Sequence, residues 1–170
     1  MVNARLTAIN ATAVDQRLLR TTFGCFPSGV TAVCGLAGRE PVGMAVSSFI
    51  SVSLDPPLVS VCVANSSTTW PRLRALGRLG VSVLGEAHDL AARQLSARDG
   101  DRFAGMELTS TSGGALFVAG SAATLECELV SEVPAGDHLI ALLRIHALDS
   151  DANVTPLVFH GSRFRQLASI

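Results

Sequence analysis

Short apolar runs with the β-branched residues that are typical of β-strands recur along most of the chain. Runs of this kind, rich in Val, Ile and other β-branched residues, lie at 30–34, 42–48, 49–54, 58–63, 79–84, 122–133, 138–149, 157–160 and 164–167. Runs of 4–8 alternating residues that are bounded by Gly, Pro, Asn or Asp predict strands. Because strands dominate and most connections are short, the pattern predicts a mainly β fold. We expect a closed or split β-barrel with a few short peripheral helices at its ends.

Three segments have the spacing of helices instead, at residues 14–26, 66–76 and 86–97. Pro27 ends the first of them, because proline cannot continue a helix. In the third, Leu90, Ala91 and Leu95 are expected to face inward. The stretch 105–114 is rich in Ser, Thr and Gly and is expected to be a loop.

The composition indicates one domain with much apolar surface to bury. The chain has 170 residues, of which 48% are hydrophobic and 16% are charged, whereas soluble domains carry about 25% charged residues. We therefore expect burial against a second copy of the chain, in a homodimer. Residues 1–12 show no periodicity and are predicted to be a flexible N-terminus, so that the domain spans 13–170.

The lengths of the apolar runs, the net charge and the absence of common catalytic motifs argue against several classes of protein. The apolar runs are far shorter than the roughly 20 residues of a spanning helix, and residues 1–13 lack the apolar core of a signal peptide. We therefore expect a cytoplasmic protein with no membrane association. The formal net charge is −1 and no basic stripe appears, which argues against nucleic acid as a partner. The GxGxxG fingerprint, the phosphate-binding loop, the nucleophile elbow and HExxH are all absent.

Histidine and cysteine do not suggest a metal centre. The four histidines lack the spacing of metal ligands, so no metal site is expected from them. The chain has no CxxC pair, and three of its cysteines lie in apolar, strand-like runs. We interpret the cysteines as buried reduced thiols, with disulfide bonds or a metal site as the alternatives; they are Cys25, Cys34, Cys62 and Cys127.

Two groupings of hydroxyl residues carry candidate binding chemistry. In 43–49 and 51–58, small hydroxyl residues stand beside apolar ones at a strand end. Such a surface offers backbone and hydroxyl partners to a flat ring with polar edges, although an ordinary serine-rich edge strand has the same pattern. The run 65–69 precedes a helix, whose free N–H groups attract phosphate. The alternative there is a plain helix cap.

Two further groupings place a cationic or titratable side chain beside a turn. Arg102 could meet a phosphate and Phe103 could cover a ring, or they could be a solvated arginine and a core phenylalanine. His138, at the start of a long strand, could donate to a phosphate or an amide. Its alternative is a turn residue with a satisfied imidazole.

Taken together and in order, these segments resemble the flavin reductase-like domain family. This family comprises the short NAD(P)H:flavin oxidoreductases that serve two-component flavin-dependent monooxygenases. The similarity extends over residues 15–167, and the segments that carry it are 26–31, 43–49, 51–58, 65–69, 101–103, 125–127 and 136–138.

The resemblance implies a homodimeric split β-barrel of the FMN-binding type, with flavin at or near the subunit interface. The flavin contacts that it implies are Met44, Ala45, Val46, Ser47, Ser48 and Ser53 at the ring and ribityl chain, Asn65, Ser66, Ser67 and Arg102 at the phosphate end, and Phe103. The nicotinamide side would hold Pro27, Ser28, His138, His160 and Arg163. His138 would assist nicotinamide binding, and no residue would act as a catalytic acid or base, because hydride transfer needs positioning above all.

The implied function is NAD(P)H-dependent reduction of free flavin, which then diffuses to a separate monooxygenase. FMN is the expected flavin, with FAD as the other choice. NADH is favoured over NADPH because the sequence shows no cluster of arginines for a 2′-phosphate. The alternatives are a non-catalytic flavin-binding protein, a structural or interaction barrel, and a relative acting on pyridoxamine phosphate.

Overall fold

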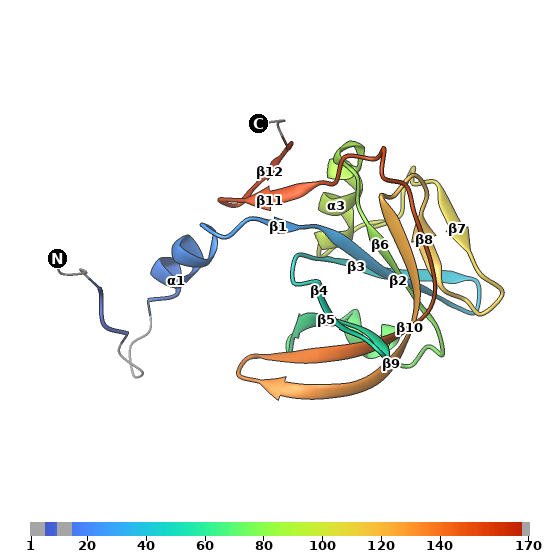
Figure 1. The fold of residues 1–170 in the computed structure, drawn as a ribbon, viewed down its shortest axis with the longest axis horizontal. Coiled ribbons are helices and arrows are strands. Elements are labelled where there is room, and N and C mark those ends of the chain that lie inside the picture. The colour runs from blue at the N-terminus through green and yellow to red at the C-terminus, as the bar shows by residue number, and fades with distance from the viewer. Residues whose placement is uncertain (1–5, 10–14, 168–170) are drawn as a thin grey trace.

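The computed structural model describes residues 6–9 and 15–167, and most of this part is one antiparallel seven-stranded sheet. Its strand order is β3-β2-β6-β9-β10-β5-β4. Figure 1 shows that the sheet curves strongly. Because β3 and β4 stand at its two ends and are not paired with each other, the sheet is not closed. The mainly β prediction is confirmed, with these strand bounds: β2 (Thr31–Ala37), β3 (Glu40–Val46), β4 (Ile50–Leu54), β5 (Pro57–Ala64), β6 (Leu79–Val83), β9 (Ala123–Ala135) and β10 (His138–Ser150).

Smaller elements surround this sheet. A three-stranded sheet has the order β1-β11-β12, and β7 pairs with β8. Their bounds are β1 (Ser28–Gly29), β11 (Val158–His160), β12 (Arg163–Arg165), β7 (Leu108–Ser110) and β8 (Leu116–Val118). The helices are α1 (Gln16–Phe23), α2 (Trp70–Leu73), the 3₁₀ turn η1 (Glu86–His88) and α3 (Asp89–Ser96).

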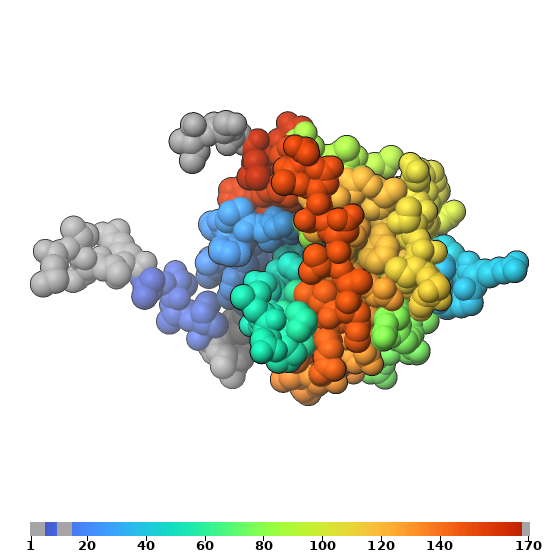
Figure 2. All heavy atoms as spheres, turned by 45° about the vertical axis from the view of Figure 1, so that its right-hand side comes forward, coloured from blue at the N-terminus to red at the C-terminus, as the bar shows by residue number. Residues whose placement is uncertain are grey.

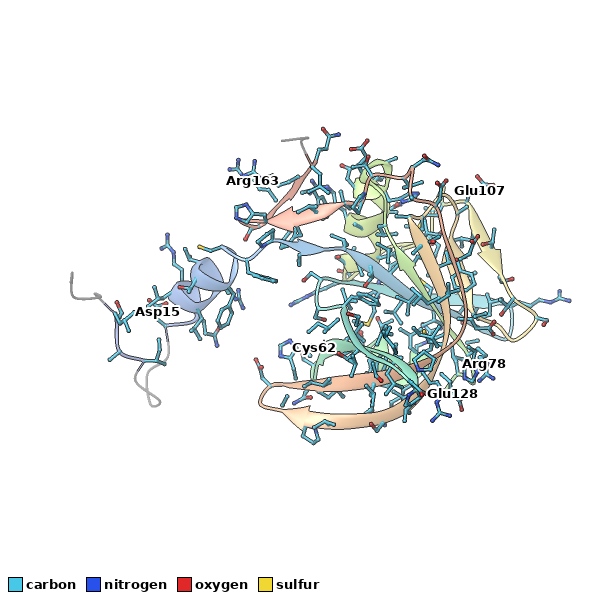
Figure 3. All side chains as sticks on the ribbon, viewed as in Figure 1. Asp15, Cys62, Arg78, Glu107, Glu128 and Arg163 are labelled. Atoms are coloured by element: carbon cyan, nitrogen blue, oxygen red, sulfur yellow. The ribbon has the colours of Figure 1, made fainter. Side chains whose placement is uncertain are left out.

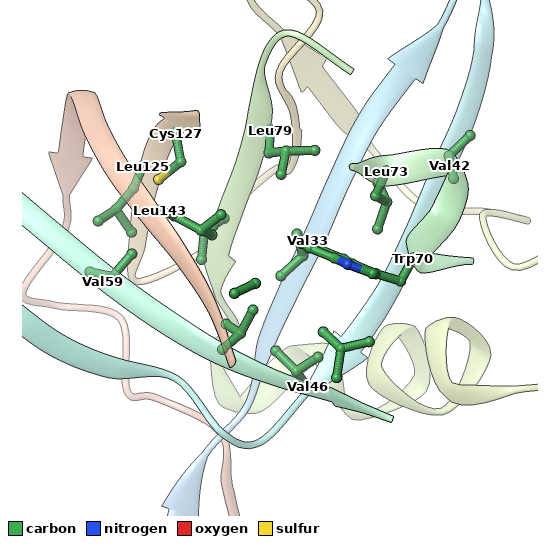
Figure 4. Packing of buried hydrophobic residues seen from close by; sticks show 14 residues of the cluster. Val33, Val42, Val46, Val59, Trp70, Leu73, Leu79, Leu125, Cys127 and Leu143 are labelled. Atoms are coloured by element: carbon green, nitrogen blue, oxygen red, sulfur yellow. The ribbon is translucent and has the colours of Figure 1, made fainter. Parts of the chain in front are cut away.

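The core lies on both faces of the curved sheet, because neighbouring residues of a strand point to opposite faces. Val33 of β2 packs into an inner cluster with Val81 and Leu143, as Figure 4 shows. Trp70 of α2 belongs to the same cluster, and its indole Nε1 donates to Glu132 of β9 at 2.5 Å. On the outer face, the neighbours of Val33 pack with α3, through Ala92 and Leu95.

The structure corrects several predictions about the helices. The first helix ends at Phe23, buries no residue and leaves Phe23 67% exposed, because no other element among residues 6–9 and 15–167 covers its apolar side. The predicted Val14 lies outside the described residues. The second helix is shorter than expected and ends at Leu73. In α3, Ala92 is buried and Leu90 is 64% exposed. The face of α3 that packs on the sheet contains positions 91, 92 and 95, and position 90 lies outside this face.

Three other predictions also meet the structure here. The loop expected at 105–114 contains β7, which pairs with β8 through a turn, because the apolar Leu108 has a partner strand to pack beside. The flexible N-terminus predicted for 1–12 lies largely outside the described residues, and within it 6–9 form neither helix nor strand. In the described part of the chain no helix has the length and apolarity that a bilayer crossing requires.

All four cysteines are free thiols, which excludes the disulfide alternative. Cys34 and Cys127 are buried, and burial raises the pKa of each thiol to about 12. Cys25, however, is exposed, because it follows a helix that no other element covers, so its predicted burial is wrong. Across the described ranges, no three His, Cys, Asp or Glu side chains gather as they would around a metal.

Candidate functional site

The segment expected to contact flavin lies at the free edge of the sheet. Met44, Ala45 and Val46 are in β3, which pairs only with β2. An edge strand presents unpaired N–H and C=O groups that can bind another molecule. Val46 is buried and Met44 packs against the inner cluster, so their backbone faces outward more than their side chains. Ser47, directly after the strand, is exposed.

The two other serines predicted there differ in their freedom. The Ser48 hydroxyl donates to the Cys62 carbonyl at 3.1 Å and accepts from the Cys62 N–H at 2.8 Å. It therefore holds the β3–β4 turn against β5. Ser53 is half-buried in β4, beside an irregularity in the pairing of β4 with β5.

Ser47 opens into a pocket of about 360 Å³, which we call the aromatic pocket. It lies between the end of α1 and the β11–β12 turn, where the Gly161 N–H donates to the Gly24 carbonyl at 3.0 Å. A smaller pocket of about 130 Å³ shares Ser47 and Phe159 with it. The lining of the aromatic pocket is Arg20, Phe23, Gly24, Phe26, Ser28, Ser47, Phe159, His160, Gly161 and Ser162.

Two aromatic contacts position the Phe159 wall of this pocket. The Phe159 and Phe164 rings meet edge to face, with their centroids 5.7 Å apart. The guanidinium carbon of Arg93, on α3, lies 4.8 Å from the centre of the Phe164 ring, within the range of a cation–π contact. Arg93 thus links the β11–β12 hairpin to α3 and keeps Phe159 at the rim.

A second pocket, of about 560 Å³, lies along the same edge of β3, and we call it the arginine pocket. Arg102 stands at its inner corner, where its Nη1 donates to the Thr69 hydroxyl at 2.6 Å and to the Gly43 carbonyl at 3.2 Å. These two bonds orient the guanidinium and leave its other donors available for an anion. The lining is Glu40, Pro41, Val42, Gly43, Thr68, Thr69, Arg72, Arg98, Gly100, Asp101, Arg102 and Phe103.

The predicted phosphate-end residues divide between this corner and the neighbouring turns. Arg102 and Phe103 line the arginine pocket, but Asn65, Ser66 and Ser67 do not. The Ser67 hydroxyl accepts the Trp70 N–H at 3.1 Å, and so it holds the turn that leads into α2. Asn65 donates from its side chain to the Gly136 carbonyl at 3.2 Å, and so it holds the β9–β10 turn.

His138 lies at that β9–β10 turn, at the start of β10. Its Nδ1 is 2.7 Å from Asp137 Oδ1, and this hydrogen bond and the charge of the imidazole hold the pKa of Asp137 below its usual value. The turn is well separated from β11 in Figure 1, and His138 lines neither pocket. The structure therefore brings Ser28, Ser47 and His160 of this chain together, but not His138 with them.

The remaining nicotinamide-side residues are at the margin. Pro27 directly precedes β1 and is exposed. Arg163 pairs with His160 across the β11–β12 hairpin, and Figure 3 shows its side chain directed outward from the molecule.

Sequence reasoning did not select Arg72, Arg98 or Phe159 for the site. The three share no motif. Arg72 and Arg98 are 26 positions apart in the sequence, and only the packing of α2 and α3 beside β3 makes them neighbours. The sequence offers one signal for Arg72, which is its place outside the apolar face of a short helix. Arginines in such positions are too common to identify a site.

The site is thus the open edge of a curved β-sheet, with the aromatic pocket at one end and the arginine pocket at the other. Residues 23–168 match the model of the family described as "Flavin reductase like domain". The chain is 37% identical over 158 residues to the actinorhodin polyketide dimerase of Streptomyces coelicolor, covering 92% of this chain and 89% of that protein. It is 35% identical over 157 residues to the reductase subunit of a flavin-dependent monooxygenase from Rhodococcus jostii, covering 92% and 80%.

Among solved structures, the chain resembles the NADH:FAD oxidoreductase of Streptomyces globisporus C-1027 in complex with NAD and FAD fragments. The TM-score is 0.87 and the sequence identity is 36%, over 96% of this chain and 98% of that chain. The chain therefore belongs to the flavin reductase-like domain family, as the motifs in its sequence predict.

Proposed function

We propose that this chain is an NAD(P)H-dependent flavin reductase that supplies reduced flavin to a separate monooxygenase. The observation that carries the proposal is the continuity along the edge of β3. Ser47 opens into the aromatic pocket, and Gly43 joins Arg102 at the anion-binding corner four residues earlier. A flavin has the matching order of parts, a flat ring followed by a polyol and a phosphate. The similarity to a reductase subunit of a flavin-dependent monooxygenase and to an NADH:FAD oxidoreductase supports the same activity.

In this proposal the flavin ring lies along the backbone of Met44–Ser48, and Ser53 is near the ribityl chain. The phosphate lies at Arg102, with Thr69 beside it and with Asn65, Ser66 and Ser67 in the adjoining turn. Arg102 suits this role because a guanidinium binds phosphate through two parallel hydrogen bonds. Phe103, next to Arg102, covers the apolar side of the corner.

The nicotinamide lies in the aromatic pocket, where Ser28 and His160 supply polar partners, with Pro27 and Arg163 at its margin. When bound, the two cofactors supply the hydride donor and the hydride acceptor. The residues of this chain bring the rings face to face and exclude water from between them, so that proximity provides most of the rate. No acid–base pair is required in this proposal, because the cofactors carry the hydride.

We further propose that the curved sheet is a split β-barrel and that two copies form a homodimer. Apolar side chains on α1, β4 and β9 are exposed, and exposed apolar side chains that gather on one side of a protein indicate an interaction surface. Figure 1 shows α1, β4 and the β9–β10 turn on the same side of the molecule. The residues are Phe23, Ile50, Val52, Leu54, Val130 and Val133. A cytoplasmic location agrees with the exposed free thiol of Cys25, because thiols stay reduced there.

The test follows NADH oxidation at 340 nm with added FMN or FAD. We expect turnover with flavin present and none without it. Ser47→Trp should fill the aromatic pocket and reduce kcat/KM at least tenfold, whereas Ser110→Trp, on exposed β7, should leave it unchanged. Flavin binding without NADH oxidation would instead indicate the non-catalytic flavin-binding protein. The proposal would be contradicted if the chain neither bound flavin nor oxidised NADH.

A further inference from the structure

The arginine pocket extends beyond the corner that one phosphate occupies. Its volume of about 560 Å³ is within the roughly 300–1,000 Å³ of small-molecule sites. Arg102 and Thr69 form only its inner end. The pocket continues along β3 from Gly43 to Glu40, and three residues of strand span about 10 Å. This outer part is large enough for more than the phosphate of a mononucleotide.

Two further guanidinium groups face this outer part. Arg72, on α2, lies 2.9 Å from Glu40 in an ion pair whose side chains are 50% and 68% exposed. Exposed pairs of this kind contribute little stability, so Arg72 can exchange Glu40 for a phosphate at small cost. Arg98 follows α3, and within the described residues it forms no ion pair. Neither arginine is used by a flavin that ends at Arg102.

From these observations we infer that the arginine pocket binds the adenylate half of FAD, which makes FAD the preferred flavin of this chain. The inference rests on the proposed function, because it continues the same ligand past Arg102. The first phosphate of FAD lies at Arg102 and Thr69, and the second lies between Arg72 and Arg98. A planar guanidinium also stacks on aromatic rings, which suits Arg98 beside the purine.

This inference changes the FMN expectation that the sequence favours. The sequence favours NADH over NADPH because it shows no cluster of arginines. The fold does bring arginines together, in the arginine pocket. A 2′-phosphate of NADPH has the same chemistry as a second flavin phosphate. The location of the pocket favours FAD, because it adjoins the flavin edge of β3 and not the aromatic pocket.

The experiment measures binding of FAD and FMN by quenching of flavin fluorescence, without any nicotinamide. The variants are Arg72→Gln and Arg98→Gln. The control is Arg39→Gln, which removes the same charge at the β2–β3 turn, a projection on the surface in Figure 2. Each charge-assisted hydrogen bond is worth enough to change affinity about tenfold. We therefore expect FAD to bind the wild type about tenfold or more tightly than FMN. Each variant should weaken FAD about tenfold and change FMN less than twofold, and the control should change neither. In a separate assay at 340 nm, the KM for NADPH should be unchanged in all three variants.

Three results would overturn the inference: equal wild-type affinity for FAD and FMN, equal weakening of both flavins in the variants, or a raised KM for NADPH with FAD binding unchanged. The last would assign the pocket to the 2′-phosphate. Failure of the proposed function gives a different result. The chain would then bind FAD through Arg72 and Arg98 but would not oxidise NADH, so the adenylate site would stand without the reductase activity.

Discussion

At the scale of single residues, the polar side chains of the β9–β10 turn hold one another in place. His138 binds Asp137 at 2.7 Å, and the Asn65 N–H donates to the Asp137 carbonyl at 2.9 Å. The pKa of Asp137 is lowered mainly by its hydrogen bond to His138. A lowered carboxyl pKa means that the pair is complete above the usual Asp pKa and is lost as the pH falls through the lowered value.

We predict that His138→Ala raises the KM for NADH several-fold and changes flavin Kd less than twofold, because the imidazole positions nicotinamide without touching the flavin. The pKa of Asp137 should rise toward its usual value in the same variant, measured by NMR titration of the carboxyl. His146→Ala is the matched control, since His146 also pairs with a carboxylate, Glu128, at 2.8 Å. An unchanged KM for NADH in His138→Ala would refute the role.

At the scale of elements, β8 crosses unusually close to β6. Gly80 of β6 has no room for a side chain, because a Cβ there would collide with the backbone of Leu116. Two residues later, the buried Ser82 hydroxyl accepts the Val118 N–H at 3.1 Å. This close crossing is how the short β7–β8 hairpin attaches to the outer face of the main sheet.

Gly80→Ala should therefore lower the free energy of unfolding by about 1–3 kcal/mol or more, since backbone atoms must move to accept the methyl group. Gly77→Ala is the control, because a Cβ at Gly77 has no atom within 4 Å. Urea denaturation of the two variants makes the comparison. If the Gly80→Ala variant were as stable as the Gly77→Ala variant, the result would contradict the close approach of β8 to β6.

At the scale of the whole molecule, the site stands beside the exposed apolar side chains of α1, β4 and β9. Phe23 belongs to this apolar surface and also lines the aromatic pocket. The β9–β10 turn that carries His138 is on the same side of the molecule. We propose that the homodimer forms through this surface and brings the partner's turn to the aromatic pocket, where the partner's His138 would reach the nicotinamide. This arrangement would explain why one subunit alone keeps His138 apart from Ser28 and His160.

We expect Val52→Asp to convert the dimer to a monomer and to reduce flavin reductase activity at least tenfold, because a carboxylate on β4 cannot be buried unpaired. Light scattering after gel filtration gives the mass, and NADH oxidation gives the activity. Leu90→Asp is the control, since Leu90 is also an exposed apolar residue but belongs to α3. A wild-type chain that is monomeric at micromolar concentration would contradict the prediction.

Much of the fold can be predicted from the sequence because the relevant signals are local. The period of two in residues 30–34 and 79–84 reports the strand that each segment forms, and Gly38 and Pro134–Asp137 identify the turns. The ordered motifs from 26–31 to 136–138 likewise identify the family. Leu90 is exposed although its spacing predicts an inward position, because exposure depends on what covers a helix and the helix sequence does not contain that information.

What only the tertiary structure decided is which distant residues meet. The order β6-β9-β10-β5 joins strands far apart in the chain, and it places α2 and the end of α3 beside the free edge of β3. Arg72, Arg98 and Arg102 become one pocket for this reason alone. Side-chain pattern determines how each segment folds, because its causes act over a few residues. The grouping of charges at the site depends on long-range strand pairing and core packing, which periodicity does not encode.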